Sequence, residues 1–175
     1  MIDVRLASCM LLALVLGGCG SGAQWHASEP ETRSSIFDHP WVWRDDVGAP
    51  QRFVQWRGKP FVLTMMYTSC DGTCPRTLTQ LRQLSEQYAR EHKQAEFVVV
   101  TLDPENDTPE QLRMYRQMKA LPATWHLWTG SRAETDELLS LLGIHVMAME
   151  SHTVHDSKIV VFDGNGVSTS ELLVP

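Results

Sequence analysis

Two nearly continuous apolar segments, each followed by a helical pattern, constrain the fold of this 175-residue chain more than any other feature. They are residues 61–67 and 96–102, and such runs are typical of strands buried on both faces of a sheet. After the first run, apolar residues recur every three or four positions from Pro75 to about His92, which predicts an amphipathic helix. Strands that alternate with helices predict an α/β fold with a central sheet.

The remaining segments continue this alternation. A second helix is predicted to begin at Asp107-Thr108-Pro109, and Gly143 is well placed to end a third helix. The other predicted elements are a helix over residues 131–142 and strands over residues 41–44, 52–56, 125–130, 158–163 and 167–172.

Two cysteines lie where the first long strand meets its helix. Cys70 and Cys74 are four residues apart, and Pro75 suits the first position of a helix. Cys74 would then lie at the helix N-terminus, where unpaired N–H groups and the helix dipole favour a thiolate. Because a thiolate is both a nucleophile and a metal ligand, the pair is a candidate for redox chemistry or metal binding. A purely structural disulfide is the alternative, although so short a loop would constrain little of the unfolded chain.

The N-terminus is typical of an exported lipoprotein. Residues 1–18 combine a weakly basic start with an apolar run too short to span a bilayer, as in a signal peptide. Leu16-Gly17-Gly18-Cys19 resembles a bacterial lipobox, in which Cys19 becomes the lipidated N-terminus. We therefore expect a lipidated cysteine and flexible tether over residues 19–36 and a folded domain over residues 37–175. An ordinary signal peptide with Cys19 incidental is the alternative.

The composition limits the kinds of molecule that the chain can bind. The net charge is −6 and no basic run occurs, which argues against nucleic acid as a partner. If Cys9 leaves with the signal peptide and Cys19 carries lipid, only Cys70 and Cys74 face the oxidising compartment. The lipid would hold the domain at a membrane surface.

Further donor groups are predicted near the dithiol. Asp103 follows the second long strand, so it should lie at the same edge of the sheet. His152 and His155 precede a later strand, and Met147 and Met149 lie in the same loop. Two thiolates and one imidazole suit copper, as Cu(I) or Cu(II), whereas structural zinc usually takes four protein ligands.

Three segments in order resemble the Sco/SenC family, the thioredoxin-fold copper chaperones of cytochrome oxidase assembly. They are residues 68–75, the run from Asp103-Pro104 to Asp107-Thr108-Pro109, and His155 eight residues before Asp163. The resemblance implies a thioredoxin-like fold, with a central mixed β-sheet flanked by helices. It also implies that Cys70, Cys74 and His155 bind one copper ion, with Asp103 close to them.

The family resemblance also implies a cellular role. Members are usually anchored facing the periplasm, where they deliver copper to the binuclear copper centre of cytochrome c oxidase or reduce its cysteines. Another copper enzyme is the alternative recipient. In this chain Val154 precedes His155 and Asp156 follows it, whereas the family usually has an aspartate just before the histidine, so His152 stays an alternative ligand.

Two other functions use the same dithiol. A thiol–disulfide oxidoreductase would act on a partner's cysteines and bind copper only incidentally. A peroxide-reducing enzyme would use Cys70 as the attacked thiolate, but the cysteine spacing and the aspartate segment do not favour it. A conventional enzyme active site is not expected.

Overall fold

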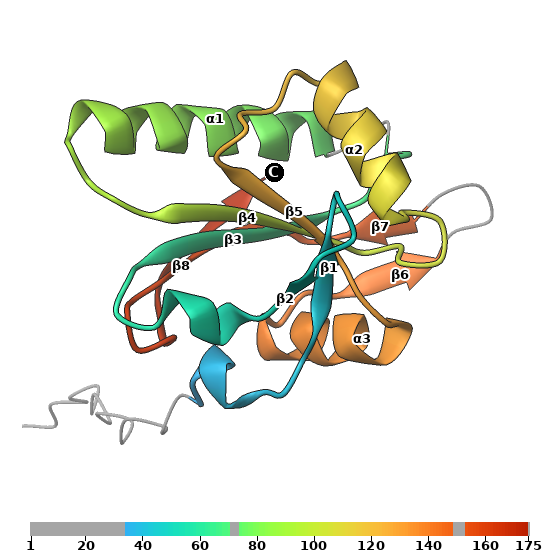
Figure 1. The fold of residues 1–175 in the computed structure, drawn as a ribbon, viewed down its shortest axis with the longest axis horizontal. Coiled ribbons are helices and arrows are strands. Elements are labelled where there is room, and N and C mark those ends of the chain that lie inside the picture. Colours follow the sequence, from blue (N-terminus) through green and yellow to red (C-terminus); the bar gives the residue numbers. More distant parts are fainter. Residues whose placement is uncertain (1–33, 71–73, 149–152, 175) are drawn as a thin grey trace, which may run out of the picture. The chain divides into compact units, whose positions relative to one another are not determined.

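A seven-stranded mixed sheet is at the centre of the computed structural model, which describes residues 34–70, 74–148 and 153–174 (Figure 1). The strand order is β2-β1-β5-β4-β3-β8-β9. The strands are β1 (Trp43–Asp45), β2 (Pro50–Gln51), β3 (Phe61–Met66), β4 (Glu96–Thr101), β5 (Trp125–Thr129), β8 (Ser157–Phe162) and β9 (Ser168–Val174). Strands β3, β4 and β5 are parallel, and the other pairs are antiparallel. The predicted thioredoxin-like α/β fold is confirmed.

Helices cover both faces of the sheet. Figure 1 shows α1 (Cys74–Arg90) and α2 (Pro109–Met118) on one side and α3 (Arg132–Leu141) on the other. Side chains of β3 alternate between the two cores: Leu63 packs in the cluster that contains Leu138 of α3, and Val62 packs in the cluster that contains Leu81 of α1. This alternation explains the continuous apolar run, because both faces of the strand are covered.

The helix starts match the sequence signals. Thr108 accepts a hydrogen bond from the backbone of Gln111, with Pro109 as the next residue. Ser131 and Glu134 form a reciprocal capping box at the start of α3. These caps fix where α2 and α3 leave the sheet edge.

The strand predicted over residues 52–56 is wrong. Phe53–Trp56 is instead a 3-10 helix. With three residues per turn, this helix brings Phe53 and Trp56 to the same side, with ring centroids 6.1 Å apart. Trp56 then stacks on Trp128, with centroids 4.8 Å apart. Packing of these aromatic rings overrides the local preference for a strand.

A short hairpin lies where the sequence predicted only a loop. It consists of β6 (Val146–Ala148) and β7 (Thr153–His155), which pair in antiparallel orientation. Each strand has three residues, too few for an alternating pattern to be recognised. The hairpin matters because it carries His155.

The described fold begins close to the predicted domain start. A 3-10 helix, Ile36–Asp38, packs Ile36 into the core with 1% of its surface exposed. The backbone N–H of Ile36 donates to Gly166, in the turn between β8 and β9. Cys9 and Cys19 lie outside the described residues. No helix in the described part of the chain is long and apolar enough to cross a membrane.

Candidate metal and redox site

The dithiol lies where β3 ends and α1 begins. Cys70 follows β3 and is partly exposed, whereas Cys74 is the first residue of α1 and is fully buried. The two residues are thiols and are not joined in a disulfide. Residues 71–73 between them lie outside the described part of the chain. The structure therefore presents one accessible sulfur and one enclosed sulfur at the same edge of the sheet.

Burial, rather than the helix dipole, dominates the ionisation of Cys74. Desolvation, together with a hydrogen bond with Cys70, raises the pKa of the Cys74 thiol to about 12. The sequence predicted the opposite, because a helix N-terminus favours a thiolate. The prediction did not anticipate that the first turn of α1 would be covered by the core.

Tyr67 links the dithiol to the aspartate loop. Burial raises the pKa of the Tyr67 hydroxyl to about 12, helped by a hydrogen bond with Cys70 and by the negative charge of Asp103. The sequence analysis did not select Tyr67 as a site residue, since it appeared only as the last position of an apolar strand. Its place directly after β3 brings it between the cysteines and Asp103.

Asp107 connects the cysteine loop, the described segment from Tyr67 to Cys70, with β4. Its carboxylate accepts hydrogen bonds from the backbone N–H of Thr68 at 3.0 Å and from the Thr68 hydroxyl at 2.5 Å. It also accepts from the hydroxyl of Thr101 at 2.5 Å, and only 2% of its surface is exposed. A buried carboxylate needs such donors to offset its lost hydration. Asp107 therefore orders the backbone two residues before Cys70, a role the sequence did not reveal.

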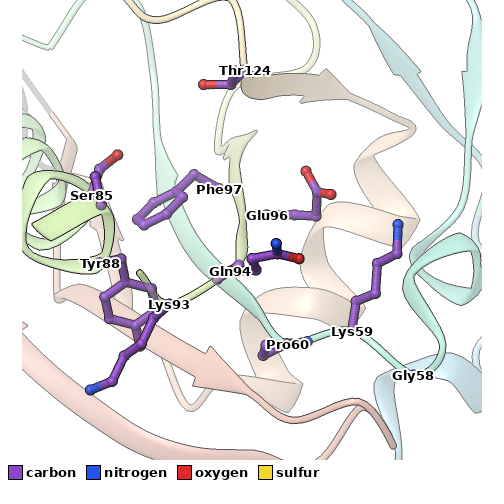
Figure 2. Close-up of a pocket in the computed structure, with 12 residues that line it drawn as sticks. Gly58, Lys59, Pro60, Ser85, Tyr88, Lys93, Gln94, Glu96, Phe97 and Thr124 are labelled. Atoms are coloured by element: carbon purple, nitrogen blue, oxygen red, sulfur yellow. The ribbon is translucent and has the colours of Figure 1, made fainter. Parts of the chain in front are cut away.

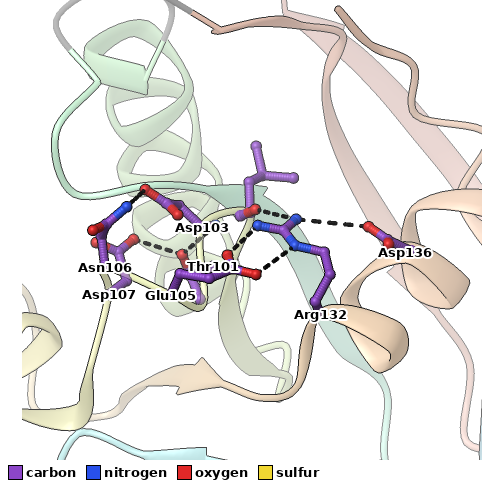
Figure 3. A network of polar contacts seen from close by, with 8 residues as sticks. Thr101, Asp103, Glu105, Asn106, Asp107, Arg132 and Asp136 are labelled. Atoms are coloured by element: carbon purple, nitrogen blue, oxygen red, sulfur yellow. Dashed lines mark hydrogen bonds and ion pairs between the residues drawn. The ribbon is translucent and has the colours of Figure 1, made fainter. Parts of the chain in front are cut away.

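Asp103 lies at the same edge, as predicted. Its carboxylate accepts from the side-chain amide of Asn106 at 2.8 Å (Figure 3). It borders a cavity of about 190 Å³ together with Tyr67, Leu102, Arg132 and Val146. This cavity joins the ends of β3 and β4 to the β6–β7 hairpin.

The hairpin places the backbone of His155 next to a residue that borders this cavity. His155 is the cross-strand partner of Val146, which borders the cavity. His152 and Met149 lie outside the described residues, and Met147 is in β6. The described side chains include no group of three His, Cys, Asp or Glu residues that could hold a metal ion. The structure thus places the dithiol and Asp103 at one edge of the sheet, and pairs the backbone of His155 with Val146, which borders the same cavity as Asp103.

Three other described histidines have structural or surface contacts. His39 stacks on Trp41 with ring centroids 4.0 Å apart. His126 pairs with Glu96 at 3.0 Å, and His145 pairs with Asp156 at 3.0 Å. None of these three pairs includes a cysteine.

A second cavity, of about 500 Å³, lies at the opposite ends of the parallel strands (Figure 2). Pro60 and Glu96, at the starts of β3 and β4, line it together with Tyr88 and Phe97. The described residues that line this cavity include no cysteine or histidine. It is therefore separate from the dithiol edge.

Comparison with known proteins identifies relatives over most of the chain. The SCO1/SenC family model matches residues 29–172. A protein of Stutzerimonas stutzeri described as copper-binding is 33% identical over 89 residues, which is 50% of this chain and 43% of that protein. This alignment and that with a SCO1 protein homolog of Bacillus subtilis cover 43% and 52% of the relatives' lengths, so the chain spans about half the length of the curated relatives that it matches.

Solved structures share the fold. A SCO1/SenC family lipoprotein of Bacillus anthracis superposes with a TM-score of 0.69 at 23% identity, covering 76% of this chain and 82% of that one. BsSco, a member of the Sco family of cytochrome c oxidase assembly proteins, superposes with a TM-score of 0.69 at 21% identity. The superposition covers 79% of this chain and 84% of that one. At these identities the structural likeness establishes the thioredoxin-like architecture.

Proposed function

The chain belongs to the SCO1/SenC family, and from this premise we propose that it binds one copper ion through Cys70, Cys74 and His155. Copper is its cargo. Asp103 would lie beside the ligands and influence the site through Tyr67. The recipient would be the copper-bearing subunit of cytochrome c oxidase, with another copper enzyme as the alternative.

The pairing of the two thiols is the observation that carries this proposal. Cys70 and Cys74 lie within hydrogen-bonding reach of one another at the sheet edge. Two adjacent sulfurs are a soft donor set that suits Cu(I), and imidazole also accommodates Cu(II). The backbone of His155 lies one strand pair from the cavity that Tyr67 and Asp103 border. A copper-binding relative supports the same assignment.

The difference in exposure between the two sulfurs suits a protein that releases its metal. Cys74 is enclosed by the core, so it would remain fixed while copper is exchanged. Cys70 is partly exposed, so an incoming ligand could approach the metal from that side. Because only the reduced dithiol offers two sulfur ligands, oxidation to a disulfide would prevent loading.

Membrane attachment would come from the segment that precedes the described fold. We propose that residues 1–18 form a signal peptide, that Cys19 is lipidated and that the residues between Cys19 and the start of the described fold form the tether, which would place the domain on the periplasmic face of a bacterial membrane. The related lipoprotein of Bacillus anthracis supports this arrangement.

Thiol–disulfide exchange is a second candidate function, favoured by the difference in exposure between Cys70 and Cys74. The accessible Cys70 thiolate would attack one sulfur of a partner disulfide, and the partner's other sulfur would leave as a thiolate and take up a proton. The Cys74 thiolate would then attack Cys70, releasing the second partner thiol. The partner gains two electrons and two protons, and the Cys70–Cys74 pair is oxidised to a disulfide.

Optical spectroscopy of the Cu(II) adduct tests the copper site. We expect an intense sulfur-to-copper charge-transfer band in the reduced wild-type protein, and its loss in Cys70→Ser and in Cys74→Ser. A thiol assay without metal would verify that the remaining cysteine of each variant is reduced, and circular dichroism would verify that the variant is folded. If the band persists when both cysteines are replaced, the proposed ligand set is wrong.

A further inference from the structure

Arg132 is the first residue of α3, and its guanidinium reaches across to the loop that follows β4 (Figure 3). Its Nε donates to Glu105 Oε1 at 2.9 Å, and one terminal nitrogen donates to Glu105 Oε2. The other terminal nitrogen donates to the carbonyl of Leu102 at 3.0 Å and lies 3.6 Å from Asp136 Oδ1. The guanidinium is thus held by two carboxylates and one backbone carbonyl.

These contacts surround Asp103 in the chain. Leu102 precedes Asp103 directly and Glu105 follows two residues later, so one guanidinium binds a backbone carbonyl before that aspartate and a side-chain carboxylate after it. The bidentate geometry to Glu105 also fixes the direction of the loop, which a single point contact would not do.

Arg132 also faces the interior of the site. It borders the 190 Å³ cavity together with Asp103, Tyr67 and Val146. Tyr67 forms a hydrogen bond with Cys70, and Val146 is the cross-strand partner of His155. A single side chain therefore contacts the aspartate loop and borders the space between the cysteine loop and the histidine hairpin.

From these contacts we propose that Arg132 is a positioning residue: it holds the loop from Leu102 to Asp107, and through the hydrogen bonds between Asp107 and Thr68 the cysteine loop, in the arrangement that binds copper. The copper-affinity test of this inference rests on the proposed function. The alkylation rate of Cys70 provides a second test that does not depend on metal.

The test compares Arg132→Gln with wild type and with Arg90→Gln, a matched control. Arg90 makes an exposed pair with Glu86 on α1, 3.9 Å apart, away from the cavity. Two quantities are measured on the folded, reduced full-length protein: Cu(I) affinity by competition with a chromophoric chelator, and the alkylation rate of Cys70 by mass spectrometry. Circular dichroism checks that each variant folds.

We expect Arg132→Gln to weaken Cu(I) binding by about tenfold, the scale seen when a group that orients metal ligands is removed. Alkylation of Cys70 should be faster, because Thr68, two residues before it, would be less firmly held by Asp107, and Arg90→Gln should match wild type in both assays. Glu105→Gln should act in the same direction and should not add to Arg132→Gln, since both remove one shared contact.

Wild-type copper affinity and wild-type Cys70 alkylation in a folded Arg132→Gln protein would overturn the inference. If Arg132→Gln does not fold, Glu105→Gln decides by the same two readouts. If wild type binds no copper, the proposed function fails, and the alkylation rate alone then decides whether Arg132 positions the cysteine loop.

Discussion

Asp107 accepts hydrogen bonds from both the backbone N–H and the hydroxyl of Thr68, across the gap between the cysteine loop and the start of α2. The two residues are 39 positions apart in the chain. This contact, together with the bond from Thr101, makes the loop before Cys70 part of the rigid sheet edge. The dithiol is thus built on an ordered support rather than on an independent loop.

Replacing Asp107 should therefore loosen that support. Asp107→Asn puts an amide N–H₂ group among three donors, so at least one donor loses its acceptor. We expect the free energy of unfolding to fall by about 1–3 kcal/mol in urea denaturation. Asp38→Asn, at an exposed carboxylate, is the matched control and should be close to neutral. Equal stabilities of the two variants would mean that the Asp107 contacts contribute little.

Alkaline pH should destabilise the fold through Cys74. Its pKa is raised from 9.0 to about 12 in the folded protein, first because it is buried. Between these values the unfolded chain loses the thiol proton while the folded protein keeps it, so stability falls as pH rises from about 9 toward 12. The free energy of unfolding, measured across this range, should fall less steeply in Cys74→Ser. The same slope in both proteins would contradict this account.

Gly166 should be intolerant of a side chain. Its φ is +77°, and an added Cβ would lie 2.5 Å from the Ser35 hydroxyl oxygen and 2.7 Å from the Phe37 ring. Gly48 has a similar φ of +87°, with no atom within 4 Å of an added Cβ. Gly48→Ala therefore measures the backbone cost alone, about 1–2 kcal/mol. Gly166→Ala should cost about 1–3 kcal/mol more in thermal or urea unfolding. A smaller loss for Gly166→Ala than for Gly48→Ala would show that the N-terminal 3-10 helix moves aside freely.

Membrane attachment should depend on Cys19. When the full chain is expressed in a bacterium, wild type should partition into the detergent phase and Cys19→Ser into the aqueous phase, because only Cys19 would carry lipid. Cys9→Ser is the matched control and should behave as wild type. Aqueous partitioning of the mature wild-type protein would contradict lipidation and favour an ordinary signal peptide with Cys19 incidental.

The sequence predicted the parts of the fold that depend on local pattern. The apolar run of β3, the helical spacing of apolar residues in α1 and the helix starts near Thr108 and Ser131 were all predicted from the sequence. The order of the predicted strands also placed Cys70, Cys74 and Asp103 at one edge, because parallel strands share their carboxyl ends.

What the sequence missed depends on contacts between distant segments. The strand predicted at residues 52–56 became a 3-10 helix because Trp56 stacks on Trp128, which is in β5. Arg132 contacts Glu105 across 27 positions, and no local pattern marks either residue. The raised pKa of Cys74 likewise follows from burial, which only the packed core reveals.

The central claim is that Cys70, Cys74 and His155 form one copper site, and an anaerobic Cu(I) competition titration of the reduced protein tests it most directly. Wild type should bind one tight copper, and Cys70→Ala, Cys74→Ala and His155→Ala should each weaken binding, whereas His152→Ala should not. Copper binding that is indifferent to both histidine substitutions would contradict the three-ligand site and favour a dithiol reductase.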